Sequence, residues 1–181
     1  MKAAFLDRDG VINRNAPRGR YIKSWDELEV LPGVADAIRL LNGANFRVIV
    51  VTNQRGVSLG LMTVEDLEEI HRRLLERLNS AGARIDAVYY CPHGEGQCDC
   101  RKPATGMFRR ALDEFPEISL RDSIVIGDSW RDMEAAGVLG CSRILVQDTT
   151  EPSCAGEPRM DVDGVAASLL EAVRQFAVGE A

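Results

Sequence analysis

Short apolar runs alternate along the chain with longer stretches in which apolar residues recur every three or four positions. The short runs have the length of buried strands, and the longer stretches have the period of amphipathic helices. Strands are predicted at residues 2–6, 47–51, 87–90, 123–126 and 143–146. Helices are predicted at residues 34–42, 64–80, about 106–115, about 132–136 and about 165–178.

A regular alternation of strands and helices is typical of right-handed βαβ units. We therefore expect an α/β fold with a doubly wound, mainly parallel sheet, whose ligands bind beyond the carboxyl ends of the strands. The 181 residues contain no repeat or long linker, so we expect a single domain over residues 1–181. Residues 151–158 form the one weak stretch that is rich in Pro and Gly.

Composition and charge exclude several classes of protein. Hydrophobic residues make up 45% and charged residues 28% of the chain, as in globular proteins. The net charge of −6 argues against binding to nucleic acid. No apolar run is long enough to cross a membrane, and Asp7 comes too early for a signal peptide. We expect a cytoplasmic monomer with neither a nucleic-acid nor a membrane partner.

Three polar clusters follow predicted strands: Asp7-Arg8-Asp9-Gly10, Thr52-Asn53-Gln54 and residues 127–132. The carboxyl ends of parallel strands meet at one edge of a sheet, so these clusters should converge. Residues two apart on a strand point to the same side, so Asp7 and Asp9 can share one small volume. With Asp128 they would form an oxygen site of the kind that Mg²⁺ prefers. The alternative is that each Asp caps a turn or helix.

A second constellation combines Cys-x-His and Cys-x-Cys in one short loop that contains two glycines. Cys91, His93, Cys98 and Cys100 can offer three thiolates and one imidazole in a tetrahedral arrangement. Four protein ligands leave no open position for a substrate, so this Zn²⁺ would be structural. The alternative is a cluster of reduced cysteines without metal, but free cysteines are usually buried in cores.

The order of these motifs carries a resemblance to a known family. Asp-x-Asp-Gly, a strand ending in Thr, a Lys, and Gly-Asp-x-x-x-Asp resemble, over residues 2–146, the haloacid dehalogenase-like phosphatase superfamily. The resemblance implies that Asp7 is the nucleophile, which forms an aspartyl-phosphate, and that Asp9 is the general acid/base. Lys102 and the Thr52 hydroxyl would surround the transferring phosphoryl group.

The same resemblance implies a catalytic Mg²⁺. Its ligands would be the Asp7 carboxylate, the Asp9 backbone carbonyl and the Asp128 carboxylate. Asp132 would orient Lys102 or a metal-bound water. A dianionic phosphoester repels a carboxylate nucleophile, so the site needs such cations around the transferring group.

The zinc motif narrows the resemblance to one subgroup, because Arg101-Lys102-Pro103 follows the last candidate ligand directly. The chain is similar to the D-glycero-D-manno-heptose 1,7-bisphosphate phosphatases and the related histidinol-phosphate phosphatases. Residues 52–56 and 60–63 look more like the heptose enzymes. This resemblance implies hydrolysis of a heptose 1,7-bisphosphate to heptose 1-phosphate. The first alternative is histidinol-phosphate hydrolysis, and the second is a non-hydrolytic phospho-acceptor or binding module.

The spacing of the motifs leaves no room for an inserted cap domain, so loops at the sheet edge must select the phosphorylated metabolite. Polar and basic residues of these loops are candidate substrate contacts: Asn15, Arg18, Asn53, Gln54, Arg55 and Arg101. For each basic residue alone, a solvated surface position is an equal alternative. His71 lies in a long amphipathic helix, where we expect a surface or packing role rather than metal ligation.

Overall fold

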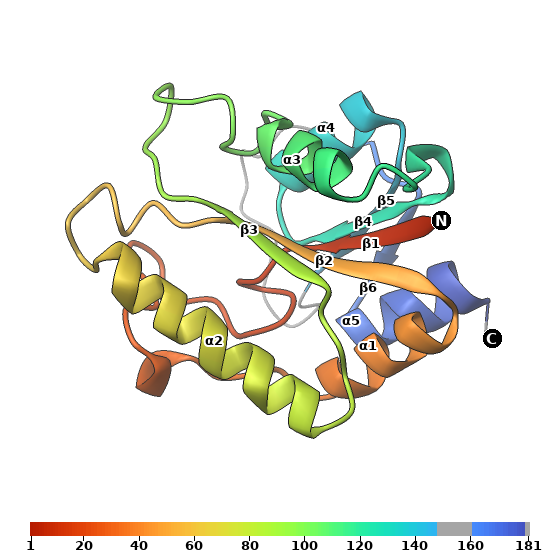
Figure 1. The fold of residues 1–181 in the computed structure, drawn as a ribbon, viewed down its shortest axis with the longest axis horizontal. Helices are drawn as coiled ribbons and strands as arrows, with labels where there is room; N and C mark the ends of the chain where they lie inside the picture. The colour runs from red at the N-terminus through yellow and green to blue at the C-terminus, as the bar shows by residue number, and fades with distance from the viewer. Residues whose placement is uncertain (148–160, 180–181) are drawn as a thin grey trace.

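The computed structural model describes residues 1–147 and 161–179 (Figure 1). In this part of the chain six strands form one parallel sheet in the order β3-β2-β1-β4-β5-β6. The strands are β1 (Lys2–Leu6), β2 (Phe46–Asn53), β3 (Ala87–Cys91), β4 (Ile124–Gly127), β5 (Ser142–Val146) and β6 (Gly164–Ala166). The α/β, doubly wound, parallel fold expected from the sequence is confirmed.

Helices cover both faces of the sheet (Figure 1). The α-helices are α1 (Val34–Gly43), α2 (Val64–Ser80), α3 (Gly106–Glu114), α4 (Trp130–Leu139) and α5 (Leu169–Ala172). The chain continues from α5 into a wider π-helical turn, η3 (Val173–Val178), and two short 3-10 turns are η1 (Trp25–Glu27) and η2 (Leu120–Asp122). The helices α3 and α4 pack on one face, and α1, α2 and α5 pack on the other.

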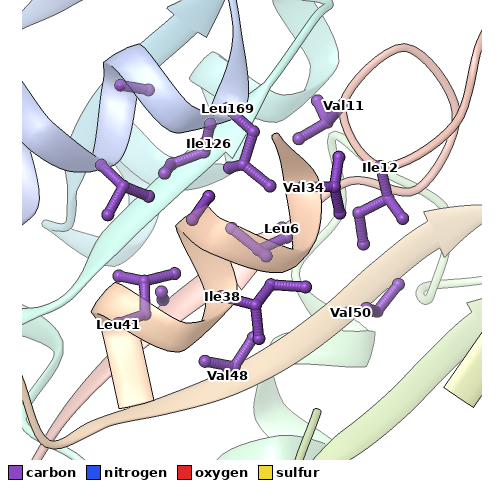
Figure 2. Close-up of a cluster of buried hydrophobic side chains, with 14 of the residues drawn as sticks. Leu6, Val11, Ile12, Val34, Ile38, Leu41, Val48, Val50, Ile126 and Leu169 are labelled. Atoms are coloured by element: carbon purple, nitrogen blue, oxygen red, sulfur yellow. The ribbon is translucent and has the colours of Figure 1, made fainter. Parts of the chain in front are cut away.

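The core divides into two layers because successive strand residues point to opposite faces. In β1, Ala4 and Leu6 face the side of α1, whereas Ala3 and Phe5 face the side of α3. Figure 2 shows Leu6 packed with Ile38 of α1 and with other apolar side chains of the first layer. Burial on both faces explains why the central strands are almost continuously apolar.

The largest error of the sequence prediction lies near the C-terminus. Residues 165–178 were expected to form one helix, but Val165 belongs to β6, which pairs with β5, and α5 begins only at Leu169. Ser168 caps α5 by accepting a hydrogen bond from the backbone N–H of Glu171. A three-residue edge strand is too short for its period to be distinguished from that of a helix.

The connections at the carboxyl edge of the sheet are loops. Between β1 and α1 the chain forms irregular segments and η1, and in the described residues no separate domain is inserted over the edge. Among the described residues, no helix has both the length and the apolar character needed to span a membrane. The Pro- and Gly-rich stretch at residues 151–158 lies outside the described residues.

Candidate active site

The polar clusters converge at the carboxyl ends of the three central strands. Asp7 follows β1, Thr52 lies at the end of β2, and Asp128 follows β4. Because β1 lies between β2 and β4, the loops that leave these strands are neighbours. The strand β2 runs to Asn53, two residues further than predicted, so Thr52 and Asn53 lie inside the ladder and are held in fixed directions.

A buried lysine lies at the centre of this edge. The Nζ atom of Lys102 lies 3.0 Å from Oδ1 of Asp7 and 2.6 Å from Oδ1 of Asp132, and it donates a hydrogen bond to the Val51 carbonyl. Burial lowers the pKa of Lys102, but the negative charges of Asp132 and Asp7 outweigh this effect and raise it above its ordinary value. The site therefore contains a permanent ammonium group beside the predicted nucleophile.

Three carboxylates face one another next to this ammonium. Asp7, Asp128 and Asp132 each have an oxygen within 4.8 Å of an oxygen of the other two. Burial, followed by the charges of neighbouring carboxylates, raises the pKa of Asp128 to about 6, and burial raises that of Asp7 to about 8 despite the opposing charge of Lys102. The raised pKa values mean that burial of these groups as anions is costly, and a hard cation would offset that cost. Carboxylate oxygens are the donors that Mg²⁺ prefers. The residues present therefore fit Mg²⁺.

Asn15 and Gly10 shape the wall of this acidic cluster. The Asn15 amide donates a 2.6 Å hydrogen bond to Oδ2 of Asp128, so the structure places this predicted substrate contact against a predicted metal ligand. Gly10 has a φ of +82°, and a Cβ at this position would lie 2.0 Å from Oδ2 of Asp128. Glycine is thus required here both by backbone conformation and by close approach.

The carboxylate of Asp9 is held apart from this cluster. Nη2 of Arg8 donates to both Asp9 oxygens, at 2.9 and 3.0 Å, while Asn13 donates to Oδ1 and Gln54 to Oδ2, each at 2.8 Å. Burial raises the pKa of Asp9, but the charge of Arg8 and the hydrogen bonds from Asn13 and Gln54 hold it below its usual value. Asp9 is therefore ionised in this arrangement.

Two of the predicted substrate contacts, Asn53 and Gln54, bond to other residues of the site. The Gln54 amide is buried and also donates to Oγ1 of Thr52 at 2.9 Å. The Asn53 amide bonds both backbone groups of Lys102: it accepts from the N–H at 3.0 Å and donates to the carbonyl at 3.1 Å. These bonds tie Asn53 to Lys102 and Gln54 to Asp9 and Thr52. Contact of either side chain with the substrate stays a prediction.

The three basic loop residues lie at different positions around the edge. Arg18 is exposed in the loop after β1, Arg55 is half-buried after β2, and Arg101 is half-buried before Lys102. In the part of the chain that the structure describes, none of them pairs with a carboxylate of the site. The Nε atoms of Arg55 and Arg101 are buried without a hydrogen-bond partner.

The cysteine loop gathers its four candidate ligands at one point. The three Sγ atoms of Cys91, Cys98 and Cys100 lie 3.0–3.5 Å apart, and Nδ1 of His93 lies 3.3 Å from Sγ of Cys100 and 3.7 Å from Sγ of Cys91. Sulfur ligands of a tetrahedral zinc ion with bonds of about 2.3 Å would lie slightly further apart. The donor set of three thiols and one imidazole fits Zn²⁺.

The sequence alone predicts no role for Arg8 or Asn13, and it indicates only a packing or surface position for His71. Arg8 is fully buried, and its Nη1 lies 3.1 Å from Nε2 of His71, which is itself buried in α2. His71 therefore has the packing role expected of it, with a polar contact in addition. The sequence does offer one sign of a role for Arg8: it is a basic residue between Asp7 and Asp9, so it has two acidic neighbours with which it could pair.

Comparisons with known proteins agree with this architecture. Residues 99–172 match the family model described as HAD-hydrolase-like. The D-glycero-beta-D-manno-heptose-1,7-bisphosphate 7-phosphatase of Rhodopseudomonas palustris is 44% identical over 146 residues, which are 76% of this chain and 79% of the relative. The D-glycero-alpha-D-manno-heptose-1,7-bisphosphate 7-phosphatase of Mycobacterium tuberculosis is 38% identical over 180 residues, which are 96% of this chain and 88% of the relative.

A solved structure extends this similarity to three dimensions. The D,D-heptose 1,7-bisphosphate phosphatase of Bordetella bronchiseptica, complexed with magnesium and phosphate, superposes with a TM-score of 0.84 at 36% identity. The match covers 97% of this chain and 98% of that one. The parallel sheet, the motifs at its edge and these relatives agree: the chain belongs to the heptose-bisphosphate phosphatase family of the haloacid dehalogenase-like hydrolases.

Proposed function

We propose that this protein is a Mg²⁺-dependent phosphatase that removes the 7-phosphate of D-glycero-D-manno-heptose 1,7-bisphosphate and leaves heptose 1-phosphate. The observation that carries the proposal is the buried contact of Lys102 with Asp7 at the carboxyl end of β1. It sets a carboxylate nucleophile beside a fixed cation, which is what attack on a dianionic phosphoester requires. The names of the relatives support the choice of substrate.

The reaction takes two steps. In the first, a carboxylate oxygen of Asp7 bonds to phosphorus while the bond from phosphorus to the sugar oxygen breaks. The electron pair leaves with that oxygen, and Asp9 donates a proton to it. In the second, a water oxygen bonds to phosphorus and gives its proton to Asp9, and the bond from Asp7 to phosphorus breaks. Phosphate is released, the Asp7 carboxylate is restored, and Asp9 is protonated again.

The protonation state of Asp9 must change when substrate binds. Asp9 is ionised in the structure, because Arg8, Asn13 and Gln54 donate to its oxygens. A dianionic phosphoester beside it adds negative charge, which favours the protonated carboxyl group. Substrate binding thus prepares the acid that the first step uses.

Two metals complete the proposal. Asp7 and Asp128, with the Asp9 backbone carbonyl, would hold Mg²⁺, which neutralises charge on the transferring phosphoryl group. Asp132 would keep Lys102 directed at the same group, as its 2.6 Å contact indicates. Cys91, His93, Cys98 and Cys100 would hold a structural Zn²⁺ that fixes the loop before Lys102.

The second phosphate of the substrate has a candidate place beside the zinc loop. A groove of about 220 Å³ is lined by Lys102, Arg101, Trp130 and Arg131, together with Glu95, Gly96, Cys98 and Pro103. Arg131 pairs with Glu95, whereas the buried Nε of Arg101 has no hydrogen-bond partner. This buried Nε is out of reach of a ligand, but Arg101 lines the groove, and among the described residues its other N–H groups make one long hydrogen bond, from Nη1 to the His93 carbonyl at 3.4 Å. The outer N–H groups of its guanidinium therefore suit a phosphate oxygen.

The test is turnover on a panel of substrates in the presence of Mg²⁺. The panel contains both anomers of the heptose 1,7-bisphosphate, heptose 7-phosphate and histidinol phosphate. We expect kcat/KM for a bisphosphate to exceed that for heptose 7-phosphate by about tenfold or more, because one charged contact is worth about 1.5–3 kcal/mol. A higher kcat/KM for histidinol phosphate than for the heptose bisphosphate would contradict the proposed substrate. Labelling of the protein without phosphate release would instead indicate a phospho-acceptor.

A further inference from the structure

His71 connects the helix α2 to the predicted acid/base residue through one intermediate side chain. Its ring is buried, and Nε2 lies 3.1 Å from Nη1 of Arg8, a residue 63 positions earlier in the chain. The ring also packs on Tyr90 of β3, with 5.6 Å between ring centroids. The helix that carries His71 has a defined start, because Thr63 and Asp66 form a reciprocal capping box. The backbone of α2 and the packing of the ring on Tyr90 therefore fix the position of His71.

Arg8 is the intermediate side chain, and its guanidinium bonds to Asp9, Gln54 and His71. It is fully buried, and its Nε and Nη2 both donate to the Asp9 carboxylate. Nη2 also lies 3.1 Å from Oε1 of Gln54. An arginine has donors only, so the contact of Nη1 with His71 requires Nε2 to be the acceptor and leaves the ring proton on Nδ1. Burial, reinforced by the charge of Arg8, lowers the pKa of His71 to about 3, so the ring is neutral.

An acid/base residue transfers protons only at hydrogen-bond distance from the reacting oxygen. Both oxygens of Asp9 are occupied by protein donors in the structure, so the carboxyl group has to release one of them to serve the substrate. During that movement the guanidinium of Arg8 would lose its main anchor. Among the residues that the structure describes, His71 of α2 and Gln54, which follows β2, are the two groups that keep holding it.

We propose that His71 is a positioning residue of this phosphatase, which anchors the guanidinium of Arg8 and thereby fixes the position to which the Asp9 carboxyl group is directed. The proposal deepens the proposed function, because it rests on Asp9 as the acid/base. It assigns His71 a role in proton transfer without contact to the substrate.

The test compares His71→Leu with His71→Gln. Leucine removes the acceptor, whereas the glutamine oxygen reaches about as far as Nε2 and restores it. For each variant kcat/KM is measured on the heptose bisphosphate, which has a poor leaving group, and on p-nitrophenyl phosphate, which has a good one. This parameter covers the steps through departure of the leaving group, in which Asp9 acts as an acid. Leu74→Ala is the control, because Leu74 is buried in the same helix and has no polar side-chain atom that could bond to Arg8.

We expect His71→Leu to lose about 10- to 100-fold on the sugar phosphate and less than about threefold on the aryl phosphate, since general acid catalysis contributes about 10²- to 10⁴-fold. His71→Gln should recover most of the loss, and Leu74→Ala should keep the wild-type ratio of the two substrates. Equal losses on both substrates, or no loss, would overturn the proposal. If His71→Leu does not fold, His71→Asn, whose amide falls short of Arg8, gives the same comparison.

Asp9→Asn, measured on the same two substrates, distinguishes failure of the proposed acid role of Asp9 from failure of the proposed role of His71. If Asp9→Asn itself shows no preference for the good leaving group, the acid role in the proposed function is wrong. If Asp9→Asn shows that preference and the His71 variants do not, only the role of His71 is wrong.

Discussion

Lys102 contacts Asp7 at 3.0 Å although the two residues are 95 positions apart. The lysine side chain is almost fully enclosed, and its ammonium group is shared with Asp132. A cation in this position lowers the repulsion between the Asp7 carboxylate and an incoming phosphoester. To hold the ammonium group there, the loop before Lys102 must have a fixed position. We propose that the zinc ion supplies this by fixing the loop.

Replacement of the predicted nucleophile tests the covalent mechanism. Asp7→Asn keeps the shape of the side chain but removes its negative charge. We expect kcat to fall by about a thousandfold or more, because the uncatalysed reaction is extremely slow and no other group can attack. Phosphate release is the measurement, with Asp113→Asn on the exposed face of α3 as the control. Residual turnover of more than a few per cent would exclude Asp7 as the nucleophile.

The close approach of Gly10 to Asp128 gives a prediction about magnesium. Gly10→Ala places a methyl group on the Asp128 carboxylate, so we expect the Mg²⁺ concentration for half-maximal activity to rise about tenfold or more. Gly19→Ala is a matched control, because Gly19 has a similar φ of +78° but no atom within 4 Å of its Cβ position. If both variants respond alike to Mg²⁺, backbone conformation and not the carboxylate contact explains the effect.

The cysteine loop gives a prediction about zinc and stability. Cys98→Ser should lower the zinc content well below about one ion per chain, and the unfolding temperature should fall by about 5 °C or more. Elemental analysis and thermal unfolding measure the two effects. Cys141→Ser is the control, since Cys141 is buried outside the loop and should leave the zinc content unchanged. Wild-type protein prepared without chelators and found to lack zinc would refute the site.

Arg101 and Lys102 are adjacent in sequence but should affect different substrates. Arg101→Ala should lower kcat/KM for the bisphosphate by about 10- to 100-fold and barely change that for p-nitrophenyl phosphate, which cannot reach Arg101. Lys102→Ala should lower both, because both substrates present the same transferring group. Arg109→Ala removes a cation that pairs with Asp99 outside the groove and is the control. Equal losses for both substrates in Arg101→Ala would contradict recognition of a second phosphate.

The sequence could predict the edge of the sheet at which the polar residues meet. Parallel strands point the same way, so clusters that follow β1 and β4 must lie at the same edge, and Asp7 and Asp128 are neighbours there in the structure. The zinc motif is equally local, because its ligands lie within ten residues of one another. Both predictions need only spacing and strand direction.

Side-chain direction could not be predicted in the same way. Gln54 follows a strand that ends at the site, and only the structure shows that its amide turns inward to Asp9 and Thr52. His71 has the spacing of an ordinary core position of α2, and its contact with Arg8 depends on how the helix packs against Tyr90 of β3. Such contacts depend on tertiary packing, which the period of a helix does not encode.

The paired hydrogen bonds between the Asn53 amide and the backbone of Lys102 have an evolutionary consequence. They attach the end of the zinc loop to the central sheet independently of the residues at its tip, 94–97. Insertions, deletions or exchanges at that tip can therefore accumulate without displacing the ammonium group from Asp7. The loop is a module that natural variation can use to change which phosphorylated compound is accepted while the bond-breaking chemistry is inherited intact.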